Sequence, residues 1–319
     1  MSDTVEAFVP GHVTGFFTID RDDADPTKTG SRGAGLTLSE GVTVRVSPAD
    51  ERAVELNGDR AEMAAAERVL RTLDVDAVVH AETDLPLGAG FGVSGGVALG
   101  TALAANATFD RQLSENELAT VAHGAEVEAG TGLGDVVAQL RGGVPVRLEP
   151  GGPQHGRLDG IARRARVEVV SFGELSTAAV IAPADGEGDI ETSGVDRDGD
   201  AGGDTSVPAN GTEPDDGTAG GDPRSQHRTH ITRKGREALS RVVKEPTLAS
   251  FVYASRRFAR ETGLLTERSR AAIEDVAEAD GEASMAMIGD TVFALGTGLT
   301  DAGYDPTVTA TSAVGATLL

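Results

Sequence analysis

A glycine-rich segment followed by a long apolar stretch constrains the fold of this chain more than any other feature. Residues 84–106 read DLPLGAGFGVSGGVALGTALAAN, and five of the nine residues from Gly88 to Gly96 are glycine. Glycine adopts positive φ without strain and lets a ligand approach the backbone closely. The Ala-rich stretch that follows is typical of a buried helix, whose free N–H groups and dipole attract anions. The segment therefore predicts a phosphate-binding loop, with a tight strand-to-helix turn as the alternative.

Two common phosphate-binding patterns fit this segment poorly. The P-loop requires Gly-Lys-[Ser/Thr], and residues 84–106 contain no lysine. The dinucleotide fingerprint Gly-x-Gly-x-x-Gly does occur at 90–95, with Asp110 twenty residues after Gly90. In that pattern the acidic residue ends a second strand, whereas the residues before Asp110 (AANATF) finish a predicted helix. A Rossmann-type nucleotide-binding protein without kinase activity is therefore a weaker alternative.

Three motifs, in order along the chain, resemble those of the GHMP kinases (galactokinase, homoserine, mevalonate and phosphomevalonate kinases). The loop at 86–96 (PLGAGFGVSGG) is similar to the family pattern P-x-G-x-G-L-G-S-S-A-A. Residues 8–15 (FVPGHVTG) resemble the first motif, A-P-G-[KR]-x-x-x-x-G, and residues 126–135 (EVEAGTGLGD) resemble the Glu…Gly…Asp segment. Three further segments look like those of the archaeal pantoate kinases: DPTKTGSRGAG (25–35), AHGAEVEAGTGLGDVVAQ (122–139) and SMAMIGDTVF (284–293).

The resemblance implies an α+β fold with the two-domain GHMP kinase architecture. The N-terminal domain, expected over residues 1–168, would resemble ribosomal protein S5 domain 2, and the C-terminal domain, expected over 169–319, would be ferredoxin-like. The implied reaction is ATP-dependent phosphorylation of (R)-pantoate to (R)-4-phosphopantoate in coenzyme A biosynthesis, with ATP and Mg²⁺ as cofactors. The alternatives are a different acceptor (homoserine, mevalonate or a sugar) and a non-catalytic nucleotide-binding protein.

The resemblance also implies roles for individual residues. Ser94 and Glu126 are the expected Mg²⁺ ligands, because Mg²⁺ prefers oxygen donors, and Glu128 is the alternative to Glu126. Asp135 is the expected catalytic carboxylate, which takes or orients the proton of the acceptor hydroxyl; its alternative role is a helix N-cap. The expected contacts to the ATP phosphates are Pro86, Gly88, Ala89, Gly90, Phe91, Gly92, Val93, Ser94, Gly95 and Gly96.

A carboxylic acid acceptor requires a cation, and arginine binds carboxylates bidentately. Arg32, inside the segment TGSRGAG, is the first choice for this role, with Ser31 and Lys28 beside it. A plain surface position is an equally good interpretation of Lys28. His12 stands where many GHMP kinases have Lys or Arg in the first motif. We expect His12 to contact the substrate or a phosphate, and a purely structural histidine is the alternative.

The charge balance excludes some partners and predicts an environment. The chain has 51 acidic and 28 basic residues, only three of them lysine, and a net charge of −23. This field has the wrong sign for binding nucleic acid. Concentrated salt would screen the self-repulsion, so the composition predicts adaptation to a salty cytoplasm, with an ordinary acidic protein as the alternative. Together with the resemblance to archaeal pantoate kinases, this implies a halophilic archaeon as the source. The absence of cysteine excludes disulfides and zinc–thiolate sites.

No segment contains the roughly 18 consecutive apolar residues of a membrane span. The first ten residues carry Asp3 and Glu6 and no basic residue, which is not typical of a signal peptide. We therefore expect a cytoplasmic protein whose main partner is a small-molecule substrate, with neither membrane nor nucleic acid. The sequence does not determine the oligomeric state, and a homodimer is one alternative.

A low-complexity acidic stretch at 185–228 interrupts the second half of the chain. Residues 185–229 include 12 acidic residues, three basic residues and ten glycines, and apolar residues are scarce. Such a composition buries too little surface to offset the entropy of ordering. We expect a disordered insertion within the C-terminal domain, acting as a solvated tether.

Elsewhere, periodicity and turn residues predict alternating strands and helices. Ser114 and Glu117 have the spacing of a capping box, and Pro246 suits the first turn of a helix. The predicted helices are 61–73, 94–108, 114–129, 232–243, 246–262 and 266–279. The predicted strands are 42–46, 75–81, 143–148, 166–172, 178–182, 284–288 and 291–295.

Overall fold

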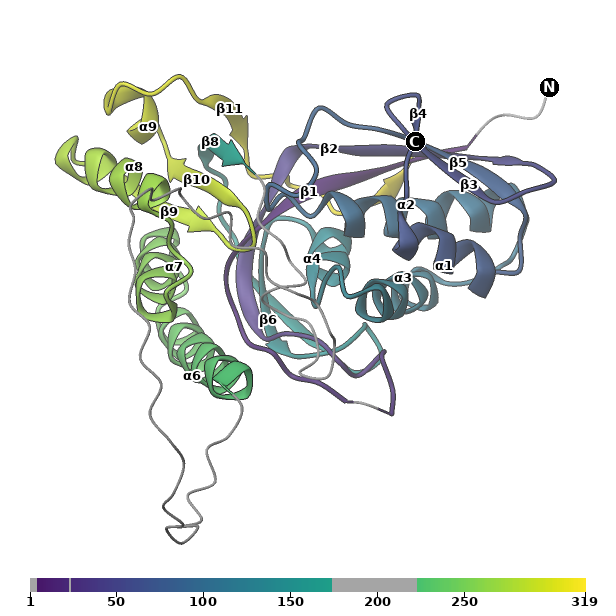
Figure 1. Cartoon of the computed structure of the whole chain (residues 1–319), viewed down its shortest axis with the longest axis horizontal. Coiled ribbons are helices and arrows are strands. Elements are labelled where there is room, and N and C mark those ends of the chain that lie inside the picture. The colour runs from purple at the N-terminus through teal and green to yellow at the C-terminus, as the bar shows by residue number, and fades with distance from the viewer. Residues whose placement is uncertain (1–4, 23, 174–222) are drawn as a thin grey trace, which may run out of the picture.

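Two long antiparallel strands, β1 (Glu6–Phe17) and β2 (Gly33–Pro48), form the centre of the larger of two sheets (Figure 1). The structure is a computed structural model that describes residues 5–22, 24–173 and 223–319. The strand order is β12-β1-β2-β5-β3-β4, and β6 and β7 extend the sheet from β2. The other strands are β3 (Ala53–Leu56), β4 (Asp59–Arg60), β5 (Ala77–Glu82), β6 (Val144–Glu149), β7 (Arg157–Ile161) and β12 (Thr317–Leu318).

Four helices lie together on one face of this sheet (Figure 1). They are α1 (Ala64–Thr72), α2 (Val93–Thr108), α3 (Glu115–Ala129) and α4 (Asp135–Arg141). Helix α2 is apolar on nearly all sides, and 12 of its residues are buried. A Cβ on Gly100 would lie 2.5 Å from Cγ2 of Val44, so glycine allows α2 to approach β2 closely.

The smaller sheet has the order β11-β8-β10-β9. Aromatic contacts connect its layer to β1: Phe16 and Phe17 pack on Phe258, and Phe251 bridges Phe16 and Phe293. Its strands are β8 (Arg166–Gly173), β9 (Glu282–Ala286), β10 (Asp290–Leu295) and β11 (Thr307–Ala310). The accompanying helices are α6 (Pro223–Lys244), α7 (Leu248–Thr262), α8 (Glu267–Glu278) and the short α9 (Gly298–Asp301).

The chain ends on the first sheet rather than the second. Strand β12 pairs with β1, and the amide of Leu319 donates to the carbonyl oxygen of Glu6 at 2.8 Å. The N-terminal and C-terminal segments are therefore neighbours in one sheet. The domain limits expected at residues 168 and 169 stay a prediction.

Local signals predicted six of the eight helices in the described residues, but α6 begins nine residues before its predicted start, and no range was predicted for α4 or α9. Helix α2 begins one residue before its predicted start, and the capping box of α3 forms as expected between Ser114 and Glu117. The expectation that Pro246 lies in the first turn of α7 is wrong. The hydroxyl of Thr247 accepts a hydrogen bond from the amide of Ser250, which makes Thr247 the N-cap.

The predicted acidic insertion overlaps with a helix at its end. Helix α6 begins at Pro223, so residues 223–228 are helical rather than part of the insertion. The remainder, 185–222, and the predicted strand 178–182 lie outside the described residues. No helix in the described part of the chain is long and apolar enough to cross a membrane.

Candidate active site

The glycine loop lines a cavity of about 330 Å³ together with residues from four other parts of the chain. Thr14 enters it from β1, Asp135 from the start of α4, and Met287 from the turn between β9 and β10. The full lining is Thr14, Glu62, Met63, Ala64, Leu87, Gly88, Gly90, Phe91, Gly92, Val93, Ser94, Thr131, Asp135, Met287 and Ile288. This cavity brings the predicted phosphate loop and the predicted catalytic carboxylate together.

The conformation of the loop explains its glycines. Gly88 and Gly90 have φ of 75° and 87°, and Gly92, the N-cap of α2, has φ of 65°. A side chain would be strained at each of these positions. The first hydrogen bond of α2 runs from the amide of Gly96 to the carbonyl of Gly92 at 2.9 Å. The amides of the three preceding residues are thus available to an anion.

Not every predicted phosphate contact faces the cavity. Pro86 is exposed and Ala89 is buried, and neither lines it. Gly95 and Gly96 pack against the side chain of Gln139: a Cβ on either would lie 3.1 Å and 3.3 Å from its amide atoms. None of these four residues lines the cavity, although the backbone amide of Gly95 is still among the three free amides at the start of α2.

A turn from the C-terminal half supports the loop. A Cβ on Gly289 would collide with the carbonyl of Ala89. The hydroxyl of Thr291 donates to the same carbonyl at 2.8 Å, and the amide of Met287 donates to the carbonyl of Thr14 at 2.8 Å. The segment 284–293 therefore holds the loop against β1, a role that its sequence alone did not indicate.

Ser94 and Glu126 meet beside the cavity. The hydroxyl of Ser94 donates to Oε1 of Glu126 at 2.7 Å, and the hydroxyl of Thr131 donates to the same oxygen at 2.7 Å. Burial raises the pKa of Glu126 to about 7, despite the two hydrogen bonds, which act to lower it. Glu128 instead forms an exposed ion pair with Arg68 at 3.0 Å. Geometry thus favours Glu126 over Glu128 as a ligand.

The donor set near Ser94 fits a hard cation held jointly with phosphate oxygens. A hydroxyl and a carboxylate are suitable Mg²⁺ ligands, and Gly132 gives the carboxylate room, because a Cβ there would collide with Oε2 of Glu126. Among the described residues, no group of three or more His, Asp or Glu side chains forms a metal site by itself. The two side chains would therefore need phosphate oxygens to complete a coordination shell.

Asp135 is held by His12. Nδ1 of His12 lies 2.6 Å from Oδ1 of Asp135, and His12 is fully buried whereas a quarter of the Asp135 side chain is exposed. Burial lowers the pKa of His12, which favours the neutral imidazole with its proton on Nδ1. Burial would raise the pKa of Asp135, but the hydrogen bond from His12 and the charge of Arg147 outweigh it and lower that pKa. Gly134, not Asp135, is the N-cap of α4.

Arg147, on β6, is a buried cation that the sequence interpretation missed. It is 2% exposed, and its Nε and Nη1 donate to the carbonyls of Ser31 and Gly134 at 3.2 Å and 3.4 Å. Within the described residues its guanidinium forms no ion pair. Burial lowers its pKa, and the nearby Asp135 raises it. The available signal was one arginine inside the otherwise apolar strand VPVRL.

The predicted acceptor residues separate in space. Ser31 is 3% exposed and contributes its carbonyl to Arg147. Arg32 instead pairs with Asp20 at 2.6 Å and Glu149 at 2.7 Å. Burial would lower the pKa of Arg32, but these two carboxylates raise it overall. Lys28 is half exposed and pairs with Asp25 at 3.5 Å, as a surface residue does.

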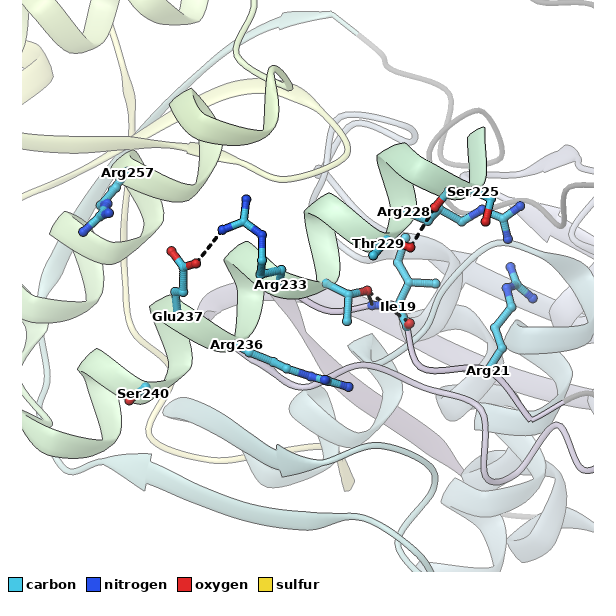
Figure 2. Close-up of a pocket in the computed structure, with 11 residues that line it drawn as sticks. Ile19, Arg21, Ser225, Arg228, Thr229, Arg233, Arg236, Glu237, Ser240 and Arg257 are labelled. Carbon is cyan, nitrogen blue, oxygen red and sulfur yellow. Dashed lines mark hydrogen bonds and ion pairs between the residues drawn. The ribbon is translucent and has the colours of Figure 1, made fainter. Parts of the chain in front are cut away.

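A larger cavity of about 940 Å³ lies between the segment after β1 and helices α6 and α7 (Figure 2). Neither the glycine loop nor Asp135 lines it. Three of its arginines form ion pairs: Arg233–Glu237 (2.7 Å), Arg236–Asp20 (3.3 Å) and Arg257–Glu261 (2.6 Å). We therefore place the candidate active site in the smaller cavity.

Comparisons with known proteins find similar sequences over most of the chain. The family model for the GHMP kinases N terminal domain matches residues 61–143. The pantoate kinase of Methanocaldococcus jannaschii is 32% identical over 90% of this chain and 91% of its own length. The pantoate kinase of Thermococcus kodakarensis is 33% identical over 91% and 87%.

Solved structures show the same fold. A phosphotransferase related to the CoA biosynthesis pathway is 29% identical, with a TM-score of 0.76 over 99% of this chain and 98% of that chain. Mevalonate pyrophosphate decarboxylase from Streptococcus pyogenes has a TM-score of 0.66 over 97% of both chains. At 13% identity, this second likeness concerns the fold alone.

Proposed function

Since the chain belongs to the pantoate kinase family of the GHMP kinases, we propose that it transfers the γ-phosphoryl group of ATP to the 4-hydroxyl of (R)-pantoate. The products are ADP and (R)-4-phosphopantoate, an intermediate of coenzyme A biosynthesis. The expected α+β GHMP kinase fold is confirmed. The observation that carries the kinase chemistry is that Asp135 and the glycine loop line one cavity.

The loop and α2 bind the phosphates of ATP. The free amides of Val93, Ser94 and Gly95 form the positive end of the α2 dipole, which faces the γ-phosphoryl group that is transferred. Ser94 and Glu126 would hold the Mg²⁺ that accompanies ATP. When bound, this ion neutralises charge on the phosphate oxygens, which is the main electrostatic requirement of phosphoryl transfer.

Asp135 orients the acceptor and removes its proton. Oδ1 is occupied by His12, so Oδ2 is the oxygen that receives the proton as the acceptor oxygen bonds to phosphorus and ADP leaves. The lowered pKa of Asp135 keeps the carboxylate ionised before the reaction. The buried, neutral His12 is a positioning residue rather than the substrate contact expected from its motif.

Arg147 is the better candidate for the cation that attracts the carboxylate of pantoate, and it would act through its charge from behind the cavity, because it is 2% exposed and does not line the cavity. It lies behind Gly134, and its charge interacts with that of the nearby Asp135, but its guanidinium forms no ion pair within the described residues. Burying an unpaired charge costs several kcal/mol, and an anionic substrate would recover that cost. Arg32 already has two carboxylate partners. Ser31 contacts Arg147 through its backbone carbonyl, which accepts from Nε of the guanidinium group.

An acceptor panel tests the proposal directly. Purified protein is assayed with ATP and Mg²⁺ against pantoate, homoserine, mevalonate and a sugar. We expect turnover with pantoate alone, and phosphorylation of another acceptor but not pantoate would reject this assignment. Asp135→Asn should abolish turnover while ATP affinity changes less than about threefold, because Asn keeps the shape and loses the base. Unchanged turnover would indicate a non-catalytic role for Asp135.

We also propose that the acidic composition adapts the protein to the cytoplasm of a halophile. The net charge of −23 includes about −9 from residues 185–229, which leaves about −14 for the rest of the chain. Dialysis from high to low potassium chloride should then unfold the protein, as followed by circular dichroism. Retention of the native spectrum at low salt would contradict the adaptation without affecting the kinase assignment. Size-exclusion chromatography in the same buffers would establish whether the protein is a homodimer.

A further inference from the structure

We propose that Gln139 is a positioning residue that joins the phosphate loop to strand β1 and so sets the distance between the loop and Asp135. The proposal rests on the kinase function proposed above. Gln139 belongs to helix α4 and is fully buried. It does not line the cavity, so its effect on the reaction has to pass through other residues.

The amide nitrogen of Gln139 connects two segments that are distant in sequence. Its Nε2 donates to the carbonyl of Pro10 at 3.0 Å and to the carbonyl of Gly92 at 2.9 Å. Pro10 is on β1, and Gly92 is the N-cap that aims α2 at the phosphates. Both N–H donors of the side-chain amide are thus used to hold these carbonyls together.

Strand β1 is open to the loop at this point because its pairing with β2 is interrupted. Pro10 is opposite Gly41, but His12 is opposite Thr37, so the register shifts between Pro10 and His12. The amide of His12 donates to the carbonyl of Phe91 at 2.9 Å instead of continuing the ladder. The loop therefore replaces β2 as the partner of β1 here, and Gln139 closes the junction.

Helix α4 carries the base and this clamp on one face. Asp135 and Gln139 are four residues apart, one helical turn, so their side chains lie above one another. Asp135 contacts His12 and Gln139 contacts Pro10, two residues earlier on the same strand. A Cβ on Gly95 would lie 3.1 Å from Oε1 of Gln139 and 3.3 Å from Cβ of Asp135, so the first turn of α2 rests on both.

The chemistry of the Gln139 side chain indicates that its two N–H donors are needed to hold the carbonyls of Pro10 and Gly92. Oε1 of Gln139 is buried and has no hydrogen-bond partner in the described residues. A buried acceptor without a partner is destabilising, and a methionine or leucine would fill the same space without it. An amide at this position is therefore explained by the two carbonyls that it holds, not by packing.

The test uses two variants of the full chain and one control. Gln139→Met keeps the length of the side chain but removes both donors. Gln139→Glu also keeps the shape of the side chain. When its carboxyl group is ionised, it repels the two carbonyl oxygens, and when it is protonated, it regains one hydrogen-bond donor. Thr101→Val is the control, because Thr101 is a fully buried residue of α2 whose hydroxyl has no partner in the described residues.

We expect Gln139→Met to lower kcat about 10- to 100-fold and to raise the KM for ATP, while the KM for the acceptor changes less than about threefold. A displacement of about 1 Å from the reacting geometry costs on the order of 100-fold in rate. Gln139→Glu should recover activity relative to wild type as pH falls from about 8 to about 6, and Gln139→Met should not. Each activity is divided by that of wild type at the same pH, and Gln139→Met shows how the remaining groups, including His12, Asp135 and Glu126, affect this ratio when position 139 carries no ionisable group.

Kinetics of Gln139→Met within about twofold of wild type would overturn the proposal. If Gln139→Met does not fold, the pH-dependent recovery of Gln139→Glu tests the proposal instead. If neither variant folds at any pH, Gln139 contributes to stability alone, and the proposal is overturned. ATP affinity is measured separately by calorimetry without acceptor. If wild type does not phosphorylate pantoate, the proposed function fails, whereas the change in ATP affinity still tests the clamp.

Discussion

Replacing Glu126 by glutamine should stabilise the free protein at alkaline pH while it abolishes catalysis. Glu126 is 2% exposed, and burial raises its pKa from 4.5 to about 7. Glutamine has the same shape and no charge. Its Oε1 can still accept from Ser94 and Thr131, which are 2.7 Å away from the present oxygen. The substitution therefore removes the cost of burying a charge and keeps both hydrogen bonds.

The direction and size of the effect follow from proton linkage. Below pH 4.5 the carboxyl is protonated in both the folded and unfolded states and carries no charge penalty. Between pH 4.5 and about 7 the folded state binds the proton more tightly, so wild-type stability falls as pH rises. Each pKa unit corresponds to about 1.4 kcal/mol. The full shift therefore makes Glu126→Gln more stable than wild type by at most about 3 kcal/mol at pH 8.

Urea denaturation at pH 5 and pH 8, in one salt concentration without nucleotide, measures this difference. Glu128→Gln is the matched control, because Glu128 is half exposed and pairs with Arg68 on the surface. We expect the control to change stability by less than about 0.5 kcal/mol at either pH. Glu126→Gln that is equally or less stable than wild type at pH 8 would refute the reasoning.

Bound nucleotide should make wild type more stable than Glu126→Gln, which reverses the order expected for the free proteins. Binding of ATP with Mg²⁺ stabilises wild type by an amount that grows with ligand concentration, and loss of the carboxylate ligand should remove most of this gain. Thermal unfolding with ATP and either Mg²⁺ or excess chelator provides the readout. Equal stabilisation of wild type and Glu126→Gln by ATP and Mg²⁺ would show that Glu126 is not a metal ligand.

Further predictions concern the acceptor, the loop support and the acidic stretch. Arg147→Met should raise the KM for pantoate at least about tenfold, because the substitution removes a buried positive charge that attracts the substrate carboxylate. Arg32→Met should change this KM less than about threefold. The reverse order in steady-state kinetics would restore Arg32 as the carboxylate ligand. Gly289→Ala should raise the KM for ATP and lower kcat, because the added Cβ would collide with the carbonyl of Ala89 and displace the loop. Wild-type kinetics would show that the turn between β9 and β10 accommodates the Cβ without moving the loop. Deletion of residues 185–222, which ends before α6, should leave kcat and both KM values within about threefold of wild type, and a larger loss would give this stretch a part in catalysis.

The local features of the site were predictable from the sequence. A run of glycines before an apolar helix predicted a phosphate-binding loop, and Gly88, Gly90 and Gly92 do adopt the positive φ that their residue type allows. Ser94 and Glu126, both expected as Mg²⁺ ligands from the motifs, lie within hydrogen-bond distance of each other, and their role as ligands stays a prediction. Both depend on residue types within short segments, where chain geometry leaves few alternatives.

Long-range contacts were not predictable in the same way. His12 and Asp135 are 123 residues apart, and Gln139 and Pro10 are 129 apart. Their meeting depends on the register of β1 against β2 and on the position of α4, which no single segment specifies. Arg32, with a promising motif around it, is engaged by Asp20 and Glu149 instead.

The sequence by itself, through motifs that resemble those of the GHMP kinases, thus predicted the kind of chemistry: a glycine loop for phosphate, oxygen ligands for a divalent cation and a carboxylate for the acceptor hydroxyl. Only the tertiary structure decided which cation is buried beside that carboxylate, which histidine nitrogen faces it, and how the loop is attached. The physical reason is that a loop conformation is set by the residues within it. The pKa of a carboxylate, by contrast, and the charge available to a substrate are set by whatever the fold packs against them.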